Sequence, residues 1–285
     1  MHHLRWGNVT VAEPGRISPR WVALIDRYLL PIVRLLWRPT LTGTENLPTD
    51  GPFLLVANHS AGMGVAEIHS FLALYLHQVG AARPLAGFAL PLGFQVWPLS
   101  AAHRELGTIP STYAAAEATL ARGVPILIFP GGDHESLAPI WRANRVDFGG
   151  RLGFLRIARA AGVPIVPLGI RGGHMTAPIL LRGKWLANVL VTPRLIGVKR
   201  WGVSVLGVLG AIALGAWLPV MWPVRAGIIW LWLGSPLTFL PWLPWTLRLQ
   251  IGAPIAAVDL FADGSDAALR QALQRVQGAV QAEAS

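Results

Sequence analysis

The segment from Trp201 to Thr246 is the strongest constraint on the fold, because Arg225 is its single charged residue. Residues 201–222 carry no charge and are numerous enough to cross the hydrocarbon core of a bilayer, yet they include four glycines and a proline. Residues 226–246 contain three further prolines and are a poor candidate for one continuous helix. The segment therefore predicts an apolar membrane hairpin, re-entrant or monotopic, with two full spans as the alternative.

Composition and charge also point to lipid. The 285 residues are 53% hydrophobic and only 13% charged, with a mean hydropathy of +0.48, whereas soluble domains carry about 25% charged residues. The net charge is +10, and the stretch between Asp147 and Asp259 holds eleven lysines and arginines but no acidic residue. Basic and apolar residues thus share one part of the chain, which favours an anionic membrane surface over nucleic acid as the partner.

The absence of cysteine narrows the chemistry. It excludes disulfides, cysteine-ligated zinc and a thiolate nucleophile, and it is compatible with the reducing cytoplasm. The first ten residues contain no basic region followed by an apolar one, so we expect no secretory signal.

Residues 1–39 are interpreted as an N-terminal arm with an amphipathic helix. Ser18 followed by Pro19 is typical of a helix start. Three arginines, spaced seven residues apart, form one stripe on this helix, and a proline inside it predicts a kink: Arg20, Arg27, Arg34 and Pro31. We expect the helix to lie in the membrane interface, with packing on its own domain as the alternative.

Residues 40–285 alternate between buried strands and helices, which predicts a single α/β domain with a largely parallel central sheet flanked by helices. Short apolar runs bounded by turn residues are interpreted as strands, and longer periodic runs as helices. The expected strands cover residues 51–58, 124–129, 163–170 and 247–251, and the expected helices cover 65–79, 110–122, 153–161 and 266–281.

Two turns at strand ends carry the candidate chemistry. Asn58, His59 and Ser60 follow the first buried strand, and the turn 129–132 (Phe-Pro-Gly-Gly) follows the second. Ligands of open α/β sheets bind outside the carboxyl ends of the strands, so both turns are expected to face one crevice.

These turns resemble the motifs of the glycerophospholipid acyltransferase superfamily, of the lysophosphatidic-acid-acyltransferase type and its bacterial members. Asn58-His59 is similar to the catalytic histidine motif, Phe129-Pro130-Gly131-Gly132 to the glycine block, and residues 163–167 to a proline-flanked strand; the resemblance covers about 40–170 and 248–255. It implies a membrane enzyme of phospholipid biosynthesis, on the cytoplasmic face of the inner membrane. Such enzymes move a fatty acyl group from acyl-CoA or acyl carrier protein to a lysophospholipid hydroxyl, without a resident cofactor or metal.

Two departures from the family pattern matter for the site. The usual acid, five residues after the histidine, would be residue 64, which is Gly64; the nearest acid is Glu67. We expect Glu67 to hold the His59 ring from the first turn of the next helix, with a helix-dipole role as the alternative. The block at 107–111 lacks the arginine of phosphate-binding members, and Gly131 replaces their glutamate. An acceptor without a free phosphomonoester is therefore conceivable.

The residues suggest direct acyl transfer, since a thioester has a good leaving group. His59 is expected to act as the general base and Glu67 to stabilise its imidazolium. The N–H groups of Gly131 and Gly132 are expected to meet the oxyanion or hold acceptor oxygens. Asn58 and Ser60 are placed beside the substrate.

The residues after the glycine turn allow several readings. Asp133 is expected to contact the acceptor or to be an alternative partner of His59. A metal held by Asp133 and Glu135 would instead indicate a lipid glycosyltransferase. Arg142 and Arg145, with Arg151, are expected to bind phosphates of the donor or head group, or the membrane surface. A catalytically inactive membrane adaptor is the remaining alternative, and the oligomeric state is not predicted.

Overall fold

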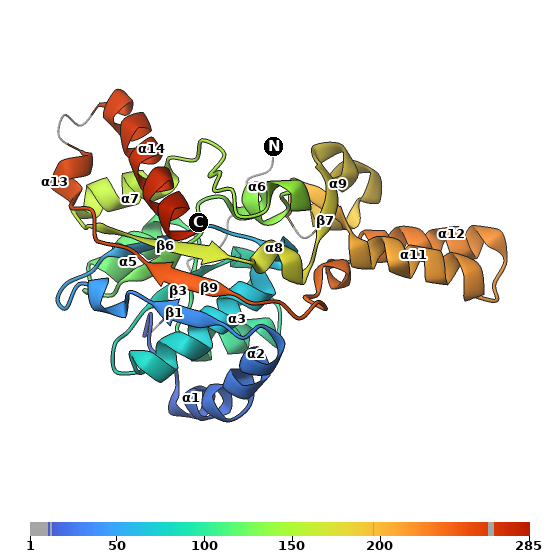
Figure 1. Ribbon diagram of the computed structural model, residues 1–285, viewed down its shortest axis with the longest axis horizontal. Coiled ribbons are helices and arrows are strands. Elements are labelled where there is room, and N and C mark those ends of the chain that lie inside the picture. The colour runs from blue at the N-terminus through green and yellow to red at the C-terminus, as the bar shows by residue number, and fades with distance from the viewer. Residues whose placement is uncertain (1–10, 12, 196, 262–264) are drawn as a thin grey trace.

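The computed structural model describes residues 11, 13–195, 197–261 and 265–285, so residues 1–10, where no secretory signal was expected, lie outside it. A seven-stranded sheet forms its centre (Figure 1). Each neighbouring pair of strands is parallel except β6 and β9, which run antiparallel. The predicted α/β fold with a largely parallel sheet is confirmed. The strand order is β1 (Thr40–Thr42), β9 (Arg248–Ile251), β6 (Ile165–Arg171), β2 (Leu54–Ala57), β5 (Ile126–Ile128), β3 (Ala86–Ala89) and β4 (Ile109–Pro110).

The central strands are apolar throughout because helices cover both faces of the sheet. All residues of β2 and β5 are buried, and Leu54 pairs with Ile126 on one side and Ile165 on the other. Alternate side chains contribute to two cores: Leu54 belongs to the core under one set of helices, and Leu55 to the core under the other. The first set is α5 (Tyr113–Leu120), α7 (Gly153–Ala161) and α14 (Asp266–Glu283), and the second includes α2 (Leu30–Leu36) and α3 (Ala61–Gln78).

The N-terminal helix is continuous but irregular. A π-helical turn, η1 (Ile25–Leu29), joins α1 (Pro19–Leu24) to α2. The kink predicted at Pro31 is thus found one turn earlier, as the π-helical turn. In a regular helix the Arg27 carbonyl would accept from the N–H of residue 31, and a proline has no N–H. Ile25, Leu30 and Val33 are buried in the same core as α3 residues. The helix thus packs on its own domain, and its arginines lie on the exposed side.

Shorter elements complete the chain. A separate antiparallel pair, β7 (Ile179–Gly183) and β8 (Trp201–Ser204), lies beside α9 (Lys184–Leu190) and α10 (Thr192–Leu195). The remaining helices are α4 (Leu99–Glu105), α6 (Gly132–Ser136), α8 (Gly173–Thr176) and α13 (Ala257–Leu260), with 3₁₀ turns η2 (Thr44–Asn46), η3 (Pro91–Phe94), η4 (Ile140–Arg142) and η5 (Pro236–Phe239).

The apolar segment folds mainly as two packed helices, α11 (Val205–Trp217) and α12 (Trp222–Leu233), which project away from the sheet (Figure 1). The first residues of the segment do not belong to these helices but form β8. Trp201, the first of them, is fully buried, and its indole N–H donates to the Leu233 carbonyl at 2.8 Å. In the described part of the chain, no helix has the length and apolar character to cross a membrane, as the two-span alternative would require.

Candidate active site

The two motif-bearing turns leave neighbouring strands at the same edge of the sheet. Val56 of β2 pairs with Ile128 of β5 in parallel register, and His59 and Phe129 follow these strands directly. The ring centroids of His59 and Phe129 are 4.8 Å apart. The structure thus brings together the histidine and the glycine block, as the strand order requires.

The His59 ring is held by Glu67. Nδ1 of His59 is hydrogen-bonded to Oε1 of Glu67, whose side chain is fully buried. Because a carboxylate only accepts, Nδ1 carries the proton and Nε2 is the nitrogen left for a substrate. Ser60 donates its N–H to the same Glu67 oxygen at 2.9 Å and its hydroxyl to the other. Ser60 is therefore placed against Glu67 instead of the predicted substrate.

Gly64 makes this arrangement possible. Its φ of +66° is a left-handed conformation, and a Cβ there would lie 2.8 Å from His59 Nδ1 and 3.0 Å from Glu67 Oε1. An acidic side chain at residue 64, as in the usual family pattern, would thus collide with the His59 ring. The acid is supplied instead by Glu67, three residues further along the chain. The expectation that the helix starts near Val65 is partly met: α3 starts at Ala61, but Gly62 and Gly64 interrupt its first turns.

Asn58 also forms its side-chain hydrogen bonds within the protein. Its side chain is buried, with the amide N–H donating to the Ile170 carbonyl at 2.8 Å and its oxygen accepting from the Ile170 N–H at 2.7 Å. These two bonds join the ends of β2 and β6. Asn58 therefore fixes the strand end that presents His59, and it is not among the residues that line the cavity beside His59.

A second buried glutamate holds the main chain of His59. Glu135 is 1% exposed; its Oε2 accepts the His59 N–H at 2.9 Å, and its Oε1 accepts the Asp147 N–H at 3.0 Å. Burial raises the pKa of the Glu135 carboxyl to about 7. A Cβ at Gly131 would lie 2.8 Å from Glu135 Cδ, so the glycine makes room for this side chain. The sequence pattern indicated Glu135 only as a metal ligand, whereas the structure places it against the main chain of His59.

The neighbours of Glu135 have separate partners. Asp133 forms an ion pair with Arg151 and lies 3.7 Å from Arg200, whereas His134 Nε2 is 2.8 Å from Asp147 Oδ2. Within the described ranges, no three histidine, cysteine or acidic side chains form a group that could hold a metal ion. The arrangement gives no support to the glycosyltransferase reading, because both Glu135 oxygens already accept backbone N–H groups.

His174 is a further buried group that the sequence did not single out. Its side chain is 3% exposed, and burial lowers the pKa of its imidazole. The preceding Gly173 lies so close to Ser60 and Glu67 that a Cβ there would lie 3.0 Å from Glu67 Oε2. The α8 turn therefore closes the far side of the His59–Glu67 pair.

A cavity of about 750 Å³ opens beside His59. Gly132 and Asp133 line it, but Arg142 and Arg145 do not, and both of these arginines are exposed. The Gly132 N–H donates to the Phe129 carbonyl at 3.2 Å, so it is already used within the turn. Most of the lining is apolar, as in many small-molecule sites; the apolar side chains include Phe88, Leu90, Ile128, Phe154 and Ile157.

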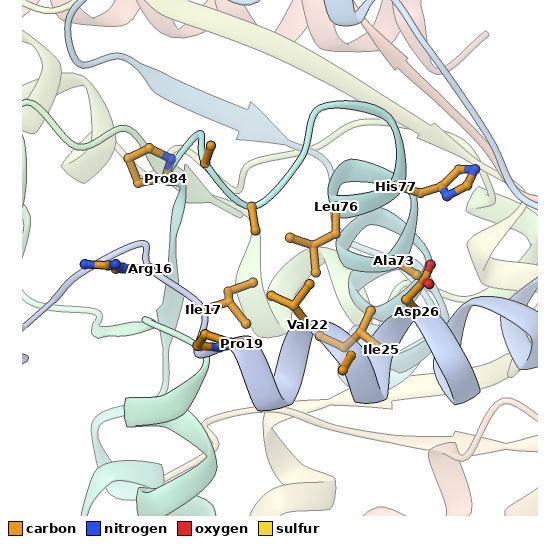
Figure 2. A pocket seen from close by; sticks show the side chains of 13 residues that line it. Arg16, Ile17, Pro19, Val22, Ile25, Asp26, Ala73, Leu76, His77 and Pro84 are labelled. Carbon is orange, nitrogen blue, oxygen red and sulfur yellow. The ribbon is translucent and has the colours of Figure 1, made fainter.

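A larger cavity of about 860 Å³ lies between the N-terminal helix and α3 (Figure 2). Val22 of the N-terminal helix and Leu76 of α3 face each other there, and Ile25, Arg16, Asp26 and His77 also line the cavity. His59 is not among its lining residues, so we place the chemistry at the smaller cavity.

Known proteins match both the sequence and the fold. Residues 38–171 match the family model described as Acyltransferase. The uncharacterized protein Rv0502 of Mycobacterium tuberculosis is 30% identical over 189 residues, 66% of this chain and 52% of its own. ML2427 of Mycobacterium leprae, also an uncharacterized protein, is 30% identical over 223 residues, 78% of this chain and 58% of its own. The chain therefore spans little more than half the length of these relatives.

The crystal structure of the 1-acyl-sn-glycerophosphate (LPA) acyltransferase PlsC from Thermotoga maritima is similar in fold. It superposes with a TM-score of 0.52 at 19% identity, covering 92% of this chain and 78% of that one. The segment that contains both turns thus matches the Acyltransferase family, and the fold of the chain is similar to that of a lysophosphatidic acid acyltransferase.

Proposed function

We propose that the protein is a membrane-associated O-acyltransferase. It moves a fatty acyl group from acyl-CoA or acyl carrier protein to the hydroxyl of a lysophospholipid or related lipid, with His59 as general base. The observation that carries this proposal is the hydrogen bond between His59 Nδ1 and the buried Glu67, at the edge of a largely apolar cavity. The bond leaves Nε2 of His59 for an acceptor hydroxyl.

The proposed reaction is a direct transfer. Nε2 of His59 takes the acceptor's proton as the hydroxyl oxygen bonds to the thioester carbonyl carbon, and the C–S bond then breaks. The thiolate leaves with the proton from the imidazolium, so no covalent enzyme intermediate is needed. Glu67 stabilises the imidazolium while it exists and keeps the ring in one tautomer.

Mutation of His59 tests this mechanism. We expect His59→Ala to lower the turnover number by roughly a hundredfold or more, because the general base is lost. The assay measures transfer of a labelled acyl chain from acyl-CoA to lysophospholipid in detergent micelles. Circular dichroism checks the fold. Normal turnover in a folded His59→Ala protein contradicts the proposal.

Membrane attachment is proposed through the α11–α12 pair. The turn between these helices is apolar and protrudes, with Trp217 82%, Trp222 75% and Met221 71% exposed. The Arg225 guanidinium donates to the carbonyls of Gly215 at 2.9 Å and Leu218 at 2.7 Å. The guanidinium thus gives the Gly215 carbonyl at the end of α11 a partner and shares the Leu218 carbonyl with the Val220 N–H, so the turn can enter an apolar phase at lower cost.

The site of lipid synthesis follows from the donors. Acyl-CoA and acyl carrier protein occur in the cytoplasm, so the proposal places the protein on the cytoplasmic face of the inner membrane. The basic stretch between Asp147 and Asp259 suits the anionic lipids of that face.

Membrane extraction tests the attachment. Salt screens exposed charges beyond about 10 Å at 0.1 M but does not weaken apolar burial. We therefore expect the full chain to resist high salt and alkaline pH and to need detergent. Replacement of residues 205–233 by a short glycine-serine linker should make it extractable by salt. Release of the unaltered protein by salt alone contradicts this attachment.

A further inference from the structure

Three arginines from separate elements gather near the His59 cavity and are called the arginine cluster here: Arg142 of η4, Arg182 of β7, and Arg200, which precedes β8. Burial and the positive charge of Arg142 lower the pKa of the Arg182 guanidinium, and the charges of Asp147 and Asp133, opposed by that of Arg200, restore it only in part. Like charges brought together at a partly buried place repel one another. The fold therefore maintains an electrostatically unfavourable arrangement there.

The nearby carboxylates do not balance the cluster. Asp133 lies 3.7 Å from Arg200 but forms its closer ion pair with Arg151, and Asp147 is hydrogen-bonded to His134. Nη1 of Arg182 is buried and has no hydrogen-bond partner. A buried guanidinium N–H without an acceptor costs free energy, so Nη1 of Arg182 is available to an acceptor from outside the chain.

The cluster borders the reaction site. Asp133 and Arg151 line the cavity with His59, and so does Lys199, the residue before Arg200. An anion held by the arginines would thus lie next to a substrate in the cavity. Guanidinium groups bind phosphate oxygens through paired N–H donors, which makes phosphate the anion that the cluster fits best.

We propose that the arginine cluster binds a phosphate group of the substrate, through Arg182 and Arg200 with Arg142 beside them. This inference rests on the proposed acyl transfer. Arg182 and Arg200 lie beyond residues 38–171, the segment that matches the family, and residues 107–111 contain no arginine. The cluster thus supplies the positive charge that this block does not. The phosphate belongs either to the acyl carrier or to the lipid head group.

Substrates with and without phosphate distinguish the two sources. Acyl-CoA is compared with acyl-pantetheine, which keeps the thioester but has no phosphate, and lysophosphatidic acid is compared with monoacylglycerol. We expect Arg182→Gln and Arg200→Gln to raise KM for one phosphate-bearing substrate roughly tenfold, with kcat little changed. KM for its phosphate-free counterpart should stay the same, and the affected pair identifies the source.

Three variants serve as controls. Arg270→Gln removes an exposed arginine from α14 that does not line the His59 cavity, and it should leave both KM values unchanged. Arg182→Lys and Arg200→Lys keep the charge and should restore part of the affinity. If KM rises equally for substrates with and without phosphate, the cluster has another role and the proposal is wrong.

A binding measurement separates this proposal from the proposed reaction. Calorimetry of pyrophosphate and of coenzyme A with the full-length protein needs no turnover. Binding that weakens in both glutamine variants and in high salt supports the cluster, even if no acyl transfer is detected. Equal binding of both ligands by the unaltered protein and both glutamine variants, or no binding at all together with unchanged KM values, overturns it.

Discussion

The turns after β2 and β5 each bring a buried glutamate to His59, but the two glutamates hold different atoms. Glu67 accepts from Nδ1 of the imidazole ring, whereas Glu135 accepts from the main-chain N–H of the same residue. A contact to the ring acts on its protonation, because the carboxylate stabilises the imidazolium directly. A contact to the main chain acts on its position. The segment after β2 thus holds the His59 ring, and the segment after β5 holds the His59 main chain.

Both turns also pair a glycine with the glutamate that follows it. Gly64 precedes Glu67 by three residues and Gly131 precedes Glu135 by four, and each glycine lacks the Cβ that would collide with the site. The glycines differ in backbone conformation: φ is +66° at Gly64 and −63° at Gly131. A side chain at Gly64 is thus unfavourable in two ways, whereas at Gly131 only the contact with Glu135 opposes it.

The largest predicted effect in this comparison concerns Glu67. Glu67→Gln keeps the volume but removes the charge beside the ring, so kcat should fall roughly tenfold to a hundredfold because the imidazolium is less stable. Steady-state kinetics at several pH values measures this loss. A smaller fall in kcat for Glu67→Gln than for Asp133→Asn would mean that Asp133, and not Glu67, is the acidic partner of His59.

Gly131→Ala is expected to have the next largest effect. The added methyl should displace Glu135 and with it the His59 main chain, lowering kcat by about tenfold. In a Glu135→Gly background the added methyl has no glutamate side chain to displace, so Gly131→Ala should lower kcat only slightly further. A double-mutant cycle measures this coupling. Additive effects of the two substitutions would show that Gly131 and Glu135 act independently.

Glu135 should also make stability depend on pH. Its folded-state pKa of about 7 is above the ordinary value of 4.5, so the folded protein keeps a proton that the unfolded chain has lost. This contribution to the free energy of unfolding therefore falls as pH rises from about 4.5 to about 7. Urea unfolding across this interval should show a shallower decline for Glu135→Gln. An identical pH dependence would mean that Glu135 is ionised throughout.

The smallest effect is expected for Asp133→Asn. Asp133 lines the cavity but pairs with Arg151, whose side chain is 40% exposed, and such pairs contribute little. The change in kcat should be less than about threefold, measured beside Glu67→Gln under the same conditions. A larger loss would indicate that Asp133 touches the reacting groups.

Much of the fold could be predicted because its central strands are buried on both faces. β2, β5 and β6 appear in the sequence as continuous apolar runs between turn residues. β1, β3 and β4 have two to four residues and no such run, and they are strands because neighbouring strands pair with them. The predicted helix 110–122 is shorter in the structure, since Pro110 belongs to β4 and Thr112 caps α5.

The site was only partly predictable. His59 and Glu67 could be named because a motif and a nearby acid were visible in the sequence. The positions of Asn58 and Glu135 depend on contacts between segments far apart in the chain, such as the 112 residues that separate Asn58 from Ile170. One local signal was available, however: each glycine replaces an acid of the usual family pattern, and a glutamate follows within four residues.

The place of β9 in the sheet sets an order of events during synthesis. β1 lies at the sheet edge with β9 as its neighbour, and Thr42 pairs with Gln250. On the ribosome, β1 therefore waits for its partner strand until the roughly 200 residues between them have been made. Residues 205–233 are translated before that strand. The apolar helices thus emerge before β1 has its neighbour in the sheet, and a membrane that takes them up does so before the sheet is fully paired.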